Sequence, residues 1–264
     1  MKLRLLSALV GMGIVLPALF YGGAVAVEIL IGIVTVLAVR EYRSMVLRER
    51  GGMGWLLAVG GFYYGWSLYG TDLGSGVLVS ACGLVLLCVA LVRATDVQAG
   101  MRHAAELLLG LFWIFVLLTH FPLVRRLDQG LDWIVLLLAV VWVGDAGAYF
   151  TGRALGKHKL YELISPNKTW EGVFGSLCTS VGAALLVHTV LLPEVHVGHF
   201  VFLGLLISVV AVLGDLFESL VKRAAGVKDS GTIMPGHGGA LDRIDSLLFG
   251  IATLHVYLRI SGVA

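Results

Sequence analysis

The chain has 264 residues, of which 58% are apolar and only 14% are charged. Soluble domains average roughly 25% charged residues, and a chain of this length cannot bury so much apolar surface in one core. The composition therefore excludes an ordinary water-soluble globule. It also excludes a disordered chain, because the charge that keeps such a chain solvated is missing.

Continuous apolar runs of about 17–21 residues recur along the chain, and a helix needs this length to cross a bilayer. They predict an all-α, polytopic membrane protein rather than an outer-membrane barrel, whose strands are shorter and alternate in polarity. In chain order the nine runs cover residues 5–21, 23–40, 54–70, 74–92, 105–123, 131–150, 172–192, 199–217 and 246–262. The first run resembles a signal peptide ending near Ala26, but cleavage there would leave too short a second run. We therefore expect a retained helix.

The basic residues predict the orientation of these nine spans. Of the 19 Lys and Arg residues, all but Arg125, Arg126 and Arg259 fall on the N-terminal side. The positive-inside rule then places the N-terminus in the cytoplasm. Two cytoplasmic loops, 151–171 and 218–245, are long and hold most of the polar residues. We expect one membrane domain, with scaffold helices in residues 1–125 and the catalytic region in residues 126–264.

Two carboxylates, Asp145 and Asp215, lie at the cytoplasmic ends of the sixth and eighth predicted helices. A carboxylate in a membrane helix is costly and by default suggests function, although a helix end in the headgroup region is the alternative. Glu218 and Lys222 follow Asp215 at spacings that put all three on one helical face. Small residues next to these carboxylates would let another helix or a ligand approach closely. They are Gly144, Gly147, Ala148 and Gly214.

The segment after the eighth helix combines cations, glycines and two carboxylates. From Ser219 to Asp245 it reads SLVKRAAGVKDSGTIMPGHGGALDRID. Glycine lets backbone N–H groups approach phosphate oxygens, and Lys and Arg neutralise phosphate charge. Asp242 and Asp245, if helical, would present hard oxygen ligands for Mg²⁺ on one face, together with substrate phosphates. The segment predicts a metal–polyphosphate site; a basic loop held by anionic lipid would explain only its cations.

The other long loop reads ISPNKTWEG from Ile164 to Gly172. Ser165 begins a turn, because Ser-Pro favours turn initiation. Lys168 could reach a phosphate, and Trp170 is more typical of a membrane interface than of base stacking.

The stretch from Ser219 to Asp245 closely resembles the signature of the phosphatidate cytidylyltransferases, also called CDP-diacylglycerol synthases. The signature elements Ser-x-apolar-Lys-Arg, Lys-Asp, Pro-Gly-His-Gly-Gly and Asp-Arg-x-Asp all stand at the family's spacing. GDAGAYFTGR and ISPNKTWEG also resemble family segments, with Asn167 where Lys is more common. The motifs cover residues 144–245, and the N-terminal half resembles the family only in its helix pattern.

The resemblance implies a nucleotidyltransferase of phospholipid biosynthesis that converts CTP and phosphatidic acid into CDP-diacylglycerol and pyrophosphate. It implies Mg²⁺-dependent in-line attack of the lipid phosphate on the α-phosphorus, at the cytoplasmic face of a bacterial-type inner membrane. Two divalent ions, or one with a monovalent ion, would fit this chemistry. A homodimer in membrane lipid is implied, and no nucleic acid partner.

Residue roles follow from matching this sequence to the signature. The expected metal ligands are Asp215 and Asp242, then Asp145, Asp245 and Glu218. The expected catalytic residues are Asp215, Asp242, Asp245, Lys222, Arg223, Lys228, Asp229 and His237. The expected nucleotide-binding residues are Lys168, Ser165, Gly236, Gly238, Gly239 and Arg243.

Two other functions compete with this interpretation. A CTP-dependent lipid kinase would release CDP instead of pyrophosphate, and the intact signature argues against it. A secondary transporter could bind a coupling ion at Asp145 and Asp215. Transporters place such sites near the bilayer midplane between repeated halves, whereas here the polar residues gather at one face and no repeat is evident.

Overall fold

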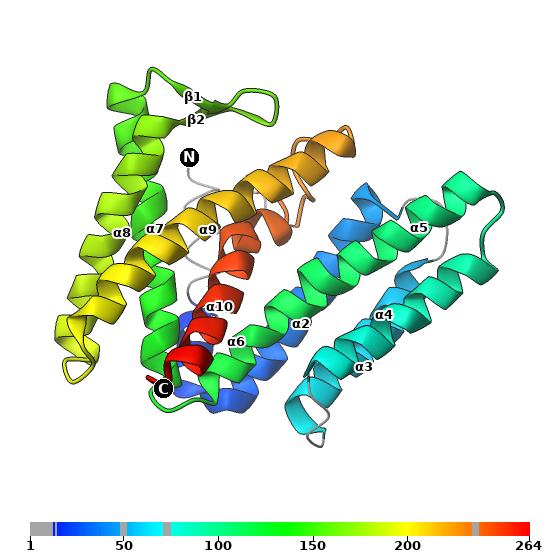
Figure 1. Ribbon diagram of the computed structural model, residues 1–264, viewed down its shortest axis with the longest axis horizontal. Helices are drawn as coiled ribbons and strands as arrows, with labels where there is room; N and C mark the ends of the chain where they lie inside the picture. Colours follow the sequence, from blue (N-terminus) through cyan, green and yellow to red (C-terminus); the bar gives the residue numbers. More distant parts are fainter. Residues whose placement is uncertain (1–12, 14, 48–51, 71–74, 234–237) are drawn as a thin grey trace. The chain divides into compact units, whose positions relative to one another are not determined.

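In a computed structural model of the protein, most of the chain is α-helical (Figure 1). The structure describes residues 13, 15–47, 52–70, 75–233 and 238–264. They form two compact units. The first unit comprises residues up to Leu123 together with Asp229–Asp242, and the second comprises Val124–Lys228 together with Arg243–Ala264.

The helices of the first unit are α2 (Gly23–Met45), α3 (Gly52–Tyr69), α4 (Ser75–Val92), α5 (Val97–Gly110) and most of α6 (Leu117–Arg125). Asp96 caps α5, because its side chain accepts a hydrogen bond from the Ala99 amide at 2.8 Å. A π-helical turn, η1 (Leu111–Val116), joins α5 to α6. The three segments therefore run as one helix over Val97–Arg125.

The core of the first unit forms where α2, α3 and η1 meet. Tyr42 is fully buried there, and its hydroxyl donates to the Glu106 carbonyl at 2.7 Å. The ring of Trp113 meets the Tyr42 ring edge-on, with 6.2 Å between centroids. Phe115 lies directly against Gly60, where even a Cβ would overlap its ring. The absence of a side chain at Gly60 therefore allows α3 to pack closely on η1.

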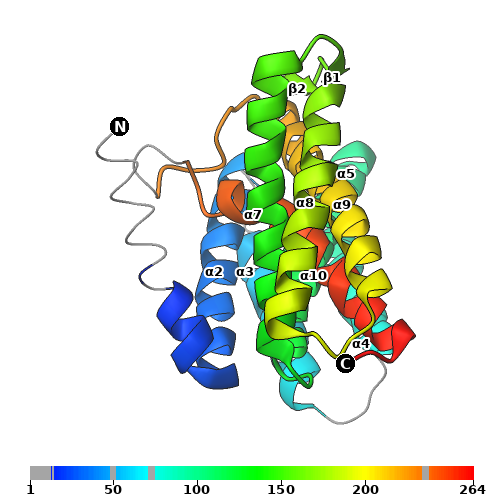
Figure 2. The ribbon, with the colours of Figure 1, turned by 90° about the vertical axis from the view of Figure 1, so that its left-hand side faces the viewer.

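The helices of the second unit are α7 (Gly130–Leu155), α8 (Trp170–Leu191), α9 (Val197–Ala224) and all but the start of α10 (Leu241–Ser261). Helices α7 and α8 lie side by side in both views (Figure 1, Figure 2). Gly144 faces Ser176, whose Oγ would lie 3.0 Å from an added Cβ, and a Cβ at Gly147 would overlap Thr179. The sequence left open whether these small residues admit another helix or a ligand. The structure supports close contact between helices.

A β-hairpin connects α7 to α8 (Figure 1). Strands β1 (Lys159–Tyr161) and β2 (Ser165–Thr169) pair antiparallel, with Lys159 opposite Thr169 and Tyr161 opposite Ser165. Thr169 also caps α8, because its hydroxyl accepts a hydrogen bond from the Gly172 amide at 3.1 Å. The apolar runs predicted helices only, so this hairpin is a feature that they did not reveal.

Six of the described helices are long and apolar enough to cross a bilayer: α2, the α5–α6 helix, α7, α8, α9 and α10. A seventh, Gly76–Val92, is apolar but shorter. Helix α3 forms over the predicted run 54–70 but is not among these candidate spans. The run 5–21 falls mostly outside the described residues. A helical, polytopic membrane protein is thus confirmed, and the number of nine spans and the N-terminal orientation stay predictions.

Candidate active site

The polar face of α9 carries Asp215, Glu218 and Lys222, as their spacing predicts. Lys222 Nζ donates to Glu218 Oε2 at 2.7 Å, one helical turn away, and Glu218 is fully buried. The helix continues to Ala224, so these residues belong to a rigid helix and not to the long loop 218–245. The lysine compensates a carboxylate that would be very costly to bury alone.

The hairpin brings a second lysine to this face of α9. Lys168 is held in β2, one residue before the capping Thr169, and its Nζ lies 2.6 Å from Asp215 Oδ2. The two side chains are 23% and 36% exposed. The Lys168 Nζ atom itself is buried, so the exposed part of this ion pair is on the Asp215 side.

A close contact between α9 and α10 brings Asp245 to the same place. Gly214 lies against the start of α10, and a Cβ on it would be 2.7 Å from the Asp245 carbonyl oxygen. The Asp245 carboxylate interacts with Asp215, Glu218 and Lys222. Gly214 thus acts as the small residue that allows two acid-bearing helices to meet.

Asp145 on α7 completes this group. Its carboxylate interacts with those of Asp215 and Asp245 and with the cations Lys168 and Arg243. We call the whole set the α9 cluster, and its members are Asp145, Lys168, Asp215, Glu218, Lys222, Arg243 and Asp245. The four carboxyl groups outnumber the three cationic side chains, so the cluster would attract a further cation when all four are ionised.

The α9 cluster fits a magnesium ion that binds together with a substrate. Its oxygen donors are of the hard type that Mg²⁺ prefers. Among the described residues, however, no three His, Cys, Asp or Glu side chains converge closely enough to hold a metal ion. Mg²⁺ commonly uses one or two carboxylates, waters and substrate phosphates. The donor set therefore matches an ion shared with a polyphosphate better than a closed protein cage.

Asp242 lies in the first unit, where its carboxylate closes a turn. Its Oδ2 accepts hydrogen bonds from the Ser230 amide at 2.9 Å, the Ser230 hydroxyl at 2.8 Å and the Gly239 amide at 2.8 Å. Gly238 has a φ of 81°, in the left-handed region that favours glycine. The Gly239 N–H, which the sequence suggested for phosphate binding, thus donates to Asp242 in this structure.

The remaining predicted residues lie outside these contacts. Arg223 Nε donates to the Ile164 carbonyl at 3.4 Å, next to the hairpin. Ser165 begins β2 and is half-buried. Lys228 and Asp229 have exposed side chains. Gly236 and His237 lie outside the described residues.

Two residues at the Asp242 turn were missed from the sequence, Ser230 and Glu41. Both are buried, with 2% and 4% of their surface exposed, and they share a hydrogen bond of 3.1 Å. Ser230 lies inside the signature at a position that seemed to carry no chemistry. Glu41 follows directly after the predicted span 23–40, and only its charge beside an apolar run could have singled it out.

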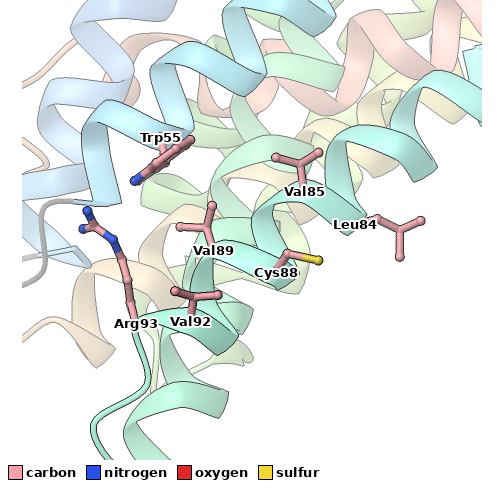
Figure 3. A pocket seen from close by; sticks show the side chains of 7 residues that line it. All are labelled: Trp55, Leu84, Val85, Cys88, Val89, Val92 and Arg93. Carbon is pink, nitrogen blue, oxygen red and sulfur yellow. The ribbon is translucent and has the colours of Figure 1, made fainter.

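A separate groove of about 490 Å³ lies between α3 and α4 of the first unit (Figure 3). It is lined by Trp55, Leu84, Val85, Cys88, Val89, Val92 and Arg93. None of the residues predicted to act in catalysis or binding is among them. The groove is lined by apolar side chains apart from Arg93.

Comparison with known proteins points to the same family as the signature segment. The model of the cytidylyltransferase family matches residues 2–261. A phosphatidate cytidylyltransferase of Staphylococcus epidermidis is 32% identical over 98% of this chain and 99% of its own length. One of Haemophilus influenzae is 35% identical over 94% of both chains, and one of Brucella suis is 42% identical over 69% of this chain and 64% of its own. The chain belongs to the cytidylyltransferase family.

Proposed function

We propose that the protein is a phosphatidate cytidylyltransferase that converts CTP and phosphatidate into CDP-diacylglycerol and pyrophosphate. The observation that carries this proposal is the similarity to proteins of that name over nearly the whole chain. A phosphate oxygen of phosphatidate attacks the α-phosphorus of CTP. The bond from that phosphorus to the bridging oxygen breaks, and pyrophosphate leaves. No protein nucleophile is required, because the phosphate monoester is itself the nucleophile.

The α9 cluster supports this chemistry because it holds acids and cations together at the ends of apolar helices. Both substrates are anions, so their approach must be offset by positive charge. Lys168 and Lys222 are the cations that lie beside Asp215 and Glu218, and we assign them to the phosphates. Positioning and charge stabilisation then supply the catalysis, as in other phosphoryl transfers.

We also propose that the bound ion is Mg²⁺. The candidate ligands are Asp145, Asp215, Asp245 and Glu218, with Asp242 as a further candidate from the signature. One or two of these carboxylates would hold the ion together with substrate phosphates and waters. When bound, the ion would neutralise phosphate charge and polarise the phosphoryl oxygens. Lys168 would hold the Asp215 carboxylate in place, because its ammonium group forms an ion pair with that carboxylate.

We further propose that the reaction takes place at the cytoplasmic face of a bacterial inner membrane. The distribution of basic residues supports this face, and CTP is a soluble cytoplasmic nucleotide. Family resemblance also leads us to propose a homodimer, which cross-linking of the protein in native membranes would test.

The decisive experiment is to incubate the purified protein with CTP, phosphatidic acid and Mg²⁺. We expect CDP-diacylglycerol and pyrophosphate in equal amounts. Diacylglycerol should not be a substrate, because it lacks the attacking phosphate. Release of CDP with phosphorylation of diacylglycerol would instead identify a lipid kinase, and uptake of a solute without chemical change would indicate a transporter.

A further inference from the structure

Glu41 is a buried carboxylate that is tied to the signature segment and that the proposed reaction does not yet use. It lies on α2 with 4% of its surface exposed. Glu41 Oε1 accepts a hydrogen bond from the Ala240 amide at 2.8 Å, and Oε2 accepts one from the Leu241 amide at 2.9 Å. These amides stand where α10 begins, so a carboxylate there also interacts favourably with the positive end of the helix.

The Ser230 hydroxyl joins Glu41 to Asp242. Ser230 Oγ lies 3.1 Å from Glu41 Oε2 and 2.8 Å from Asp242 Oδ2. Asp242 Oδ2 in turn accepts from the amides of Ser230 and Gly239. The two carboxylates therefore hold two separate parts of the signature segment, Ser230 and Gly239–Leu241. We call these contacts the Glu41 clasp.

Glycines leave room for the clasp. A Cβ on Gly231 would lie 2.6 Å from Glu41 Oε1, and a Cβ on Gly239 would overlap both Ser230 Oγ and Glu41 Oε2. A Cβ on Gly238 would overlap the Asp242 carboxylate. The small residues on either side of the signature histidine thus fit around these two carboxylates.

We infer that Glu41 is a positioning residue, which orients Asp242 and the start of α10 for binding of a magnesium–nucleotide complex. This inference rests on the proposed function. Ligating carboxylates are held by hydrogen-bonded partners, and loss of such a partner typically lowers metal affinity or activity by about 10–100-fold. Glu41 supplies that support from the N-terminal half of the chain, which the sequence suggested to be scaffold alone.

The substitution Glu41→Gln tests this role because it keeps the size of the side chain. A glutamine has one acceptor oxygen, so its NH₂ group would face one of the two backbone N–H donors and leave it unsatisfied. The matched control is Glu28→Gln. Glu28 is also a buried carboxylate on α2, and it accepts a hydrogen bond from the Tyr69 hydroxyl.

Two readouts separate positioning from general stability. The first is hydrogen–deuterium exchange of peptides that cover residues 239–246 and 76–92, measured by mass spectrometry. We expect the amides of Ala240 and Leu241 to exchange roughly tenfold faster or more in Glu41→Gln, with the α4 peptide unchanged.

The second readout is the Mg²⁺ concentration that gives half-maximal turnover. It should rise by about 10–100-fold in Glu41→Gln, while the KM for phosphatidate stays within about twofold and excess Mg²⁺ restores most of the rate.

If Glu41→Gln does not fold, Ser230→Ala decides the question, because it removes only the shared hydroxyl. It should raise the Mg²⁺ requirement while Ala240 and Leu241 stay protected from exchange. The inference is overturned by wild-type exchange at residues 239–241 of Glu41→Gln, by equal loosening of the α4 peptide, or by an unchanged Mg²⁺ requirement. Failure of the proposed function is distinguishable, since wild-type protein would then make no CDP-diacylglycerol whatever the exchange shows.

Discussion

Lys168 and Asp215 form an ion pair with 2.6 Å between Nζ and Oδ2. One residue lies in a short strand of the β1–β2 hairpin and the other in the C-terminal part of α9, so the pair joins the hairpin to a membrane helix. The Lys168 Nζ atom is buried, whereas the Asp215 side chain is 36% exposed, so the carboxylate is the partner that faces an incoming ligand. We therefore regard this pair as the centre of the α9 cluster.

Removal of the Lys168 charge should slow the proposed reaction strongly. Lys168→Gln removes a cation that would face phosphate, and loss of one charged transition-state contact typically lowers the rate by about 10²–10³-fold. The matched control is Lys159→Gln in the same hairpin, because Lys159 Nζ donates to the Pro166 carbonyl at 2.7 Å instead. Steady-state rates at varied CTP would measure both variants. Equal activity of the two would refute the role of Lys168.

The carboxylates of Asp215 and Asp245 should act as one unit. Asp215→Asn and Asp245→Asn each remove a charge that would hold the ion, and each should cost about 3–4 kcal/mol in transition-state stabilisation. The double variant should be little slower than either single variant, because residues that act together are not additive. The exposed Asp128 lies outside the cluster, and Asp128→Asn should keep near-normal turnover. Additive losses in the double variant would mean that the two acids serve separate steps.

The sequence predicted the apolar helices well, because each of them corresponds to a continuous apolar run that can be recognised without knowledge of the rest of the chain. It also predicted the shared face of Asp215, Glu218 and Lys222, since the spacing within one helix is fixed by helix geometry. The contact between Lys168 and Asp215 could not be predicted in this way, because it depends on how the hairpin folds beside α9. Glu41 was missed for the same reason, since its partners follow about 200 residues later and no local pattern connects them.

The orientation of α7 can be tested by labelling its two flanking residues. Lys157 and Asp128 are exposed beyond opposite ends of α7. In a background without the native cysteines, Lys157→Cys should react with an impermeant thiol reagent from the cytoplasmic side and Asp128→Cys from the other side. Ser230 is unsuitable for a label, because it is 2% exposed and holds the Glu41 clasp. Reaction of both cysteines from the same side would show that α7 does not cross the membrane.

The contact at Gly214 should control both stability and activity. Gly214→Ala would place a Cβ 2.7 Å from the Asp245 carbonyl and 3.2 Å from the Phe249 ring, so α10 must move away from α9. Overpacking of this kind typically costs about 1–3 kcal/mol, and a shift of about 1 Å in a reacting group can lower the rate by about 10²-fold.

The control for Gly214→Ala is Gly182→Ala in α8, where an added Cβ meets nothing within 4 Å. Because alanine favours a helix over glycine by about 0.5–1 kcal/mol, this variant should be equal to or slightly more stable than wild type. Thermal unfolding and turnover in the same detergent would compare the two. Normal turnover of Gly214→Ala would mean that Asp245 need not lie beside Asp215 for the reaction.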